Sequence, residues 1–196
     1  MALSLPDARY ITEDVRVIST RNDLRSATGS NHQRIGRKGS HYIGVFACEP
    51  MTPEDARPWR RLETDDQMVV AQIEMPGIEV GAPGAVIRVN GAGQAGASLI
   101  IDGLTANYVI RESQLLTHVS ATGAQRLYMA AEEVVANGSG QATVPLRTML
   151  TAPPADNDVI LMAGLSIEGF STLEEGSFLI DGNGYVNVRF SVEEPG

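Results

Sequence analysis

The chain contains one cysteine and few aromatic residues. Because Cys48 is the only cysteine in 196 residues, an intramolecular disulfide cannot form, and we expect a core thiol. Aromatic residues make up 5%, whereas there are 20 glycines and 10 prolines, a composition that favours short strands joined by many turns. Since 43% of the residues are apolar, the chain has enough material for a core, and we do not expect general disorder.

Long hydrophobic runs are also missing. The longest uncharged apolar run, Val159 to Leu165, is far shorter than the roughly 20 residues that cross a bilayer. The N-terminal region carries Asp7, Glu13 and Asp14 and lacks the apolar centre of a signal peptide. We therefore expect neither membrane insertion nor secretion by a signal peptide.

Basic residues are outnumbered, with 15 Lys and Arg against 24 Asp and Glu and a net charge of −9. This balance argues against sequence-specific or general nucleic-acid binding, because neutralising phosphates requires an excess of basic groups. One segment rich in Ser, Asn, Thr and Gly reverses the trend, with Asp23 as its single acid. Its basic residues, which we predict to face a partner, are Arg21, Arg25, Arg34, Arg37 and Lys38. The alternative interpretation is a solvated loop.

Sequence motifs for cofactor chemistry fail in their context. Residues 91–96 read Gly-Ala-Gly-Gln-Ala-Gly and match the dinucleotide fingerprint Gly-x-Gly-x-x-Gly. A pyrophosphate site needs a helix after these glycines, but the residues that follow are strand-like. We expect a glycine-rich loop and no cofactor. An oxidoreductase built on this motif is the weakest of our alternatives.

Catalytic and metal-binding patterns are equally weak, and we predict neither kind of residue and no enzyme. The three histidines, His32, His41 and His118, are far apart and none forms a pair at ligand spacing. The sequence has no Gly-x-Ser-x-Gly nucleophile elbow. Residues 181–184 resemble a calcium loop only superficially and predict a hairpin turn. We interpret the remaining carboxylates as a solvated acidic face: Glu168, Glu174, Glu175, Glu193 and Glu194.

The segment 37–63 joins a strand to a capped helix. Residues 40–48 alternate with apolar groups on both faces, which predicts an interior strand of a sandwich with His41 as a core histidine. Thr52 is a good N-cap, Pro53 suits the first helical position, and Asp55 completes a capping box. Pro58 lies where a helix tolerates it poorly, so we expect a short, kinked or two-part helix.

The rest of the chain predicts further strands and two crossings between units. The Pro- and Gly-rich crossings lie at 76–84 and 150–158. Between them we expect strands at 85–90, 98–102, 105–111, 126–131 and 141–146; outside them we expect strands at 67–75, 159–163, 165–170, 178–180 and 185–192. The predicted class is all-β with minor α. A β-sandwich would be formed by residues 1–78 and 160–196, and a small OB-like barrel by residues 79–159.

Three blocks together resemble the distal tail proteins of long-tailed phages, prophages and phage-like gene transfer agents. The first is Arg-Lys-Gly-Ser at 37–40, continuing to Met-Thr-Pro-Glu-Asp-Ala-Arg-Pro-Trp at 51–59. The second is the glycine loop 91–96 with Ser98-Leu99. The third is Asn-Gly-Ser-Gly-Gln-Ala-Thr-Val-Pro-Leu-Arg at 137–147, followed by Ala-Pro-Pro-Ala-Asp at 152–156. The resemblance covers residues 37 to about 170, and it departs from the family pattern at Pro58 and at 111–116.

The resemblance implies a β-sandwich belt domain that closes into a hexameric ring at the end of the tail tube, with an inserted OB-like barrel outside. It implies no catalytic residues. Expected partners are further copies of the chain, the tail tube protein, the hub and fibre proteins, and the tape measure protein. The expected location is the virion tail tip, after assembly in the host cytoplasm. The main alternative is a carbohydrate-binding module that adsorbs to host-surface glycan.

Overall fold

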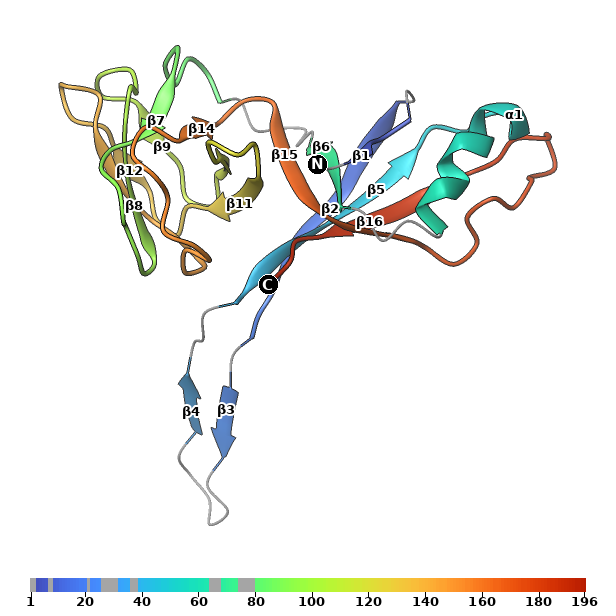
Figure 1. The fold of residues 1–196 in the computed structure, drawn as a ribbon, viewed down its shortest axis with the longest axis horizontal. Helices are drawn as coiled ribbons and strands as arrows, with labels where there is room; N and C mark the ends of the chain where they lie inside the picture. The colour runs from blue at the N-terminus through green and yellow to red at the C-terminus, as the bar shows by residue number, and fades with distance from the viewer. Residues whose placement is uncertain are drawn as a thin grey trace.

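The computed structural model describes residues 3–6, 9–20, 22–25, 32–35, 39–63, 68–73 and 80–196. Within these residues the chain is mostly β, with one short helix, so the expected all-β class with minor α is confirmed. Most of the strands belong to two six-stranded sheets, which lie next to each other along the long axis of the molecule (Figure 1).

The first sheet takes its strands from both ends of the chain. Its strands pair antiparallel, except for the parallel pair at the β1 edge. In pairing order they are β1 (Leu3–Ser4), β6 (Met68–Ile73), β15 (Leu165–Leu173), β16 (Arg189–Glu193), β5 (His41–Cys48) and β2 (Tyr10–Ile18). The nine-residue β2 therefore forms one edge of this sheet.

Aromatic residues form the core on one face of the first sheet. Phe46 of β5 stacks on Phe190 of β16 with ring centroids 5.1 Å apart, and Tyr10 meets both rings edge-on. Trp59 covers them from the helical segment and is fully buried. The opposite face is only partly covered, because Val45 and Ala47 of β5 are half-buried there. The apolar residues on the two faces of β5 are therefore buried to different extents.

The helical segment begins as its sequence predicts. The Thr52 hydroxyl accepts a hydrogen bond from the Asp55 N–H, and Pro53 occupies the first turn of α1 (Pro53–Ala56). A 3-10 segment, η1 (Arg57–Glu63), follows directly. Since Pro58 lacks an N–H for the α-helical ladder, the α-helix ends before it, and the expected two-part helix is confirmed.

The second sheet is antiparallel throughout and comes from the middle of the chain. In pairing order its strands are β11 (Gln125–Met129), β10 (Leu115–Val119), β14 (Val159–Leu161), β7 (Ile87–Val89), β8 (Ser98–Asp102) and β13 (Ala142–Pro145). Its two edges meet, because Ala130 forms a bridge with Leu146 and the Ala131 N–H donates to the Pro145 carbonyl at 2.8 Å. The sheet thus curls around its own apolar core.

Several predicted strands have different limits in the structure. The range 105–111 contains only β9 (Val109–Ile110), which pairs with β12 (Val134–Val135). The predicted strand at 185–192 begins only at Arg189, and Ile180 forms just a bridge with Val186. The strand β10 has no counterpart in the prediction. Four polar residues, 111–114, come directly before it, and the sequence around it therefore does not read as a buried strand. The strand β14, which we grouped with the C-terminal part, pairs within the second sheet.

Candidate functional site

A two-stranded arm projects from the body of the molecule. It consists of β3 (Asn22–Arg25) and β4 (His32–Ile35), which pair antiparallel and lie beyond the ends of β2 and β5 (Figure 1). Figure 1 shows this ribbon standing away from both sheets. A two-stranded ribbon is only marginally stable in water, because it has neither a third strand nor a covering layer. The arm is therefore the part of the fold best suited to completion by another surface.

The arm carries part of the predicted basic cluster. In the strand register Arg34 lies opposite Asp23, and Arg25 lies opposite His32. The segment that we expected to be either a loop or an arm thus contains a paired hairpin. The other predicted interface residues, Arg21, Arg37 and Lys38, lie outside the described residues.

The root of the arm, formed by Thr20 and by Gly39 and Ser40, is held by short-range contacts. The Ser40 hydroxyl accepts from the Thr20 N–H at 3.3 Å and lies 3.4 Å from the Thr20 hydroxyl, which ties the two strands of the hairpin together. Gly39 has φ +112°, a conformation that residues with a Cβ rarely adopt. The chain can therefore turn sharply as it enters β5.

His41 is the first residue of β5 and bonds through both ring nitrogens. Nδ1 lies 2.9 Å from the Gly39 carbonyl oxygen, and Nε2 lies 2.9 Å from Oε1 of Glu193 at the end of β16. Partial burial lowers the pKa of His41, but the Gly39 carbonyl and the Glu193 carboxylate outweigh it, so the pKa is raised above 6.5. His41 therefore connects the arm root to the C-terminal segment, beyond the expected role of a core histidine.

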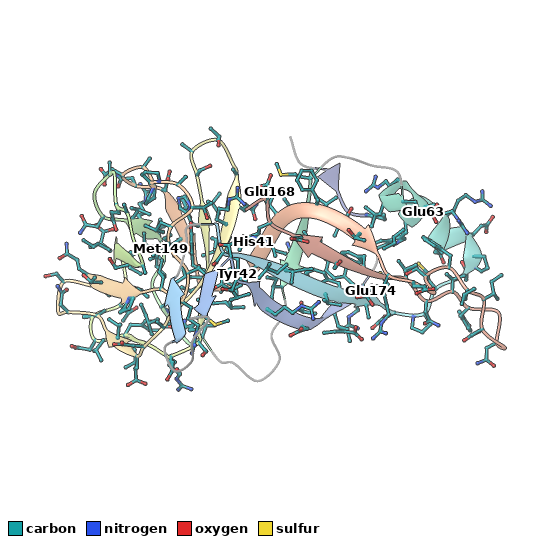
Figure 2. All side chains as sticks on the ribbon, turned by 90° about the horizontal axis from the view of Figure 1, so that it is seen from below. His41, Tyr42, Glu63, Met149, Glu168 and Glu174 are labelled. Carbon is teal, nitrogen blue, oxygen red and sulfur yellow. The ribbon has the colours of Figure 1, made fainter. Side chains whose placement is uncertain are left out.

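Two buried carboxylates join the two sheets. The strand β11 is an edge of the second sheet, and its outward N–H groups at Gln125 and Leu127 donate to Glu168 and Glu194, each at 2.6 Å. Figure 2 labels Glu168 in the region where the two sheets adjoin. Both glutamates are nearly inaccessible to solvent, so our interpretation of them as part of a solvated acidic face is wrong. Their acceptor atoms replace the missing neighbour of an edge strand.

Glu194 is the centre of this joint. Its second oxygen accepts from the Tyr42 N–H of β5 at 3.0 Å, so one carboxylate bridges both sheets. Burial raises the pKa of Glu194 to about 7, although the Leu127 and Tyr42 N–H groups and Arg126 oppose this shift. Arg126 also donates to the Pro195 carbonyl at 2.8 Å, which holds the C-terminal segment against β11.

Hydroxyl groups complete the joint. The Thr117 hydroxyl of β10 donates to the Ser166 carbonyl and accepts from the Ser166 N–H of β15, at 2.9 and 3.0 Å. The Ser166 hydroxyl in turn donates to the side-chain oxygen of Gln125. Leu115 and Leu127 of the second sheet also belong to the core of the first sheet. Polar and apolar contacts therefore hold the two sheets together.

The glycine-rich loop is closed by its own glutamine. The Gln94 side-chain NH2 lies within hydrogen-bond distance of the carbonyl oxygens of Asn90, Gly91 and Ile100, and its two hydrogens are shared among them. The side-chain oxygen accepts from the Ile100 N–H. The Gly91 N–H donates to Asp156, and the Gly93 N–H to the Pro154 carbonyl, so these two amides already have partners. The strand β8 follows the loop where a dinucleotide site would need a helix.

A second buried histidine pairs with an aspartate that is remote in sequence. Nε2 of His118 lies 2.8 Å from Oδ2 of Asp158. The same oxygen accepts from the Ala155 N–H, and Oδ1 accepts from the Ala121 N–H. Burial raises the pKa of Asp158, but these donors outweigh it, so the pKa falls below 3.8. The pair fastens β10 to the entry of β14. Because the two residues are 40 positions apart, the sequence gives no spacing signal for them.

The surface beside α1 exposes a loop of large apolar side chains. Leu179 and Ile180 are 69% and 63% exposed, and Tyr185 is 46% exposed. Between this loop and the helical segment lies a hollow of about 140 Å³, lined in part by Arg57, Arg60 and Ile180. The Arg60 guanidinium lies 4.5 Å from the Phe178 ring centroid. Isolated exposed apolar residues are ordinary, but a grouping of this kind suits contact with another protein.

Other motifs have local structural roles. The Asp181 side chain accepts from the Asn183 and Tyr185 N–H groups, which makes the segment a turn. Among the described residues, no group of three or more His, Cys, Asp or Glu side chains is arranged to hold a metal ion. The described helices also include none with the length and apolar character needed to cross a membrane.

Neither a protein-family model nor a curated protein matches this chain.

Proposed function

We propose that this protein is a structural component of the tail tip of a long-tailed phage, prophage or gene transfer agent. In this proposal six copies form a ring at the distal end of the tail tube. The first sheet, with its helical segment, acts as the β-sandwich belt of the ring, and the second sheet acts as an inserted OB-like barrel on the outside. The ring connects the tube to the hub and fibre proteins, and the tape measure protein ends near it.

The projecting arm is the observation that carries this proposal. A ribbon of β3 and β4 that carries Arg25 and Arg34 stands apart from both sheets, on a chain whose net charge is −9. A neighbouring acidic copy would supply both the missing layer and the opposite charge. The chain thus offers an arm for a neighbour and an acidic body to receive one.

Two further features support an assembled state. The strand β2 is a nine-residue edge of the first sheet, with Ile11 and Val17 exposed, and an edge of this length is a site for pairing or covering by another chain. The apolar loop at Leu179 and Ile180 is a separate candidate contact, which the hub or tube proteins would cover.

The carbohydrate-binding alternative has no comparable support. Stacking on sugar rings needs exposed aromatic faces, and residues 85–150 contain only Tyr108 and Tyr128. Tyr128 is buried, and the half-buried Tyr108 donates its hydroxyl to the Val80 carbonyl at 2.7 Å. The oxidoreductase alternative depended on the glycine loop as a dinucleotide site. In that loop the Gln94 side chain bonds to the loop's own backbone, and a strand follows where a helix would be needed.

Native mass spectrometry of the full chain, combined with electron microscopy of tail tips, tests this proposal. We expect a closed oligomer of six copies and a ring at the distal end of the tail tube, labelled by an antibody to this chain. A protein that is absent from purified particles would overturn the proposal. Specific binding on a glycan array, together with a monomer in solution, would favour the carbohydrate-binding alternative.

A further inference from the structure

The His41 side chain lies between two groups that can only accept hydrogen bonds. The Gly39 carbonyl oxygen faces Nδ1 and the Glu193 carboxylate faces Nε2, both at 2.9 Å. A neutral imidazole has a single N–H and satisfies one of these acceptors, whereas an imidazolium satisfies both. The geometry around His41 is therefore complete only when the ring is protonated.

The two acceptors belong to different parts of the fold. Gly39 is the turn at the arm root, and Glu193 is the last residue of β16 in the C-terminal segment. The side chain of His41 is 12% exposed and that of Glu193 is 49% exposed, so protons reach the pair from solvent while the ring stays fixed. The backbone of Gly196 also lies against the ring. These contacts make the arm root and the C-terminal segment one connected unit.

From these contacts we propose that His41 is a proton-dependent latch, whose imidazolium ties the arm root to the C-terminal segment and so fixes the arm relative to the two sheets. Loss of the proton breaks one of the two bonds and frees the turn at Gly39 from the end of β16. The latch is a property of the single chain and does not depend on the proposed ring.

The latch is coupled to the joint between the sheets. Glu193 precedes Glu194, which bonds to Tyr42 of β5 and Leu127 of β11. The charged groups that act on His41 are the carboxylates of Glu193 and Glu194, and Arg126 of β11 faces Glu194 from the second sheet. On the β2 side His41 pairs with the apolar Ile18. Holding Glu193 therefore also holds Glu194 in place.

The direction of the pH effect follows from the charges. The Gly39 carbonyl and the Glu193 carboxylate hold the pKa of His41 above 6.5, against the effect of burial. A raised pKa in the folded state means that the latch is complete below pH 6.5 and is lost as the pH rises through the folded value. The arm is thus fixed in mildly acidic solution and freed in alkaline solution.

Spin-label distance measurements between the arm and the second sheet test the latch. Gln33→Cys places one label on β4, and Thr143→Cys places the other at an exposed position of β13. The native thiol does not compete, because Cys48 is buried and burial raises its pKa to about 12. Dilution with unlabelled chain removes distances between copies. We expect a narrow distance distribution at pH 6 that becomes at least about twice as broad at pH 8.5.

Substitutions at the latch give the decisive comparison. His41→Gln should give the broad distribution at both pH values, whereas His118→Gln, at a histidine–carboxylate pair away from the arm, should keep the pH response. Proton NMR of the His41 ring should give a pKa above 6.5 that falls in Glu193→Gln. Equal widths at pH 6 and 8.5 in the unsubstituted chain would overturn the latch. So would a pH response that survives in His41→Gln, or a His41 pKa at or below 6.5.

Discussion

Glu194 accepts a hydrogen bond from the backbone N–H of Leu127 at 2.6 Å, although the two residues are 67 positions apart. This contact places a carboxylate from the C-terminal segment on the edge strand of the second sheet. Through its other oxygen, the same carboxylate bonds to Tyr42 of the first sheet. Edge strands need a partner for their free N–H groups, and here a side chain supplies it. One buried acid therefore contacts both sheets at once.

We expect substitution of Glu194 to change how stability depends on pH. The folded-state pKa is raised to about 7 from an ordinary value of 4.5, so the stabilisation is complete below pH 4.5 and is lost as the pH rises through 7. The free energy of unfolding should fall by roughly 3 kcal/mol across this range. Glu194→Gln does not titrate, so its urea-denaturation profile should lack this decrease.

A second substitution measures the hydrogen bonds themselves. Glu194→Ala leaves the Tyr42 and Leu127 N–H groups without acceptors and should cost about 2 to 4 kcal/mol below pH 4.5. Because alanine does not titrate, this cost should shrink as the pH rises through 7 and the unsubstituted chain loses its own stabilisation. If the profiles of Glu194→Gln and the unsubstituted chain run parallel between pH 4.5 and 8, the proposed effect of Glu194 ionisation is wrong.

Gly169 makes room for the C-terminal segment. A Cβ at this position of β15 would overlap the Glu193 carbonyl oxygen, which is backbone and cannot move aside cheaply. Gly169→Ala should therefore lower the free energy of unfolding by about 3 kcal/mol. Gly138→Ala is the matched control, since open space surrounds that position, and it should change stability by less than about 0.5 kcal/mol. Equal effects of the two substitutions in thermal unfolding would contradict the close contact.

The His118–Asp158 pair should stabilise the second sheet at neutral pH. Asp158→Asn replaces an acceptor for three donors with a group that accepts through one oxygen, and should cost about 2 to 4 kcal/mol. The folded-state pKa of Asp158 is lowered, so its stabilisation is present above pH 3.8 and is lost as the pH falls through the folded value. The cost of Asp158→Asn should therefore shrink in acid. Asp181→Asn is the control, because one oxygen accepts both bonds there and asparagine suits that turn.

Charge reversal within the predicted basic cluster should impair assembly and leave the monomer folded. We expect the double variant Arg34→Glu and Arg37→Glu to remain monomeric in native mass spectrometry, with a melting temperature within about 2 °C of the unsubstituted chain. Arg88→Glu with Arg111→Glu introduces the same change of charge on exposed positions of the middle segment and should assemble normally. Normal assembly of the variant with Arg34→Glu and Arg37→Glu would support the solvated-loop interpretation.

The sequence by itself determined the local structure. Thr52, Pro53 and Pro58 set the start and the break of the helical segment, because capping and the missing proline N–H act within one turn. Turn residues and alternation likewise predicted most strands, including β8 with its limits, and the composition predicted the all-β class.

Only the tertiary structure decided which residues meet across the chain. Glu168 and Glu194 resembled surface acids, and they are buried because β11 is an edge that needs acceptors. His41 resembled a core residue, and its second role follows from the return of β16 to the arm root. The pairing of His118 with Asp158 and the burial of β10 arise in the same way. A local pattern fixes backbone conformation, whereas the pairing order of the strands fixes which distant side chains share a site.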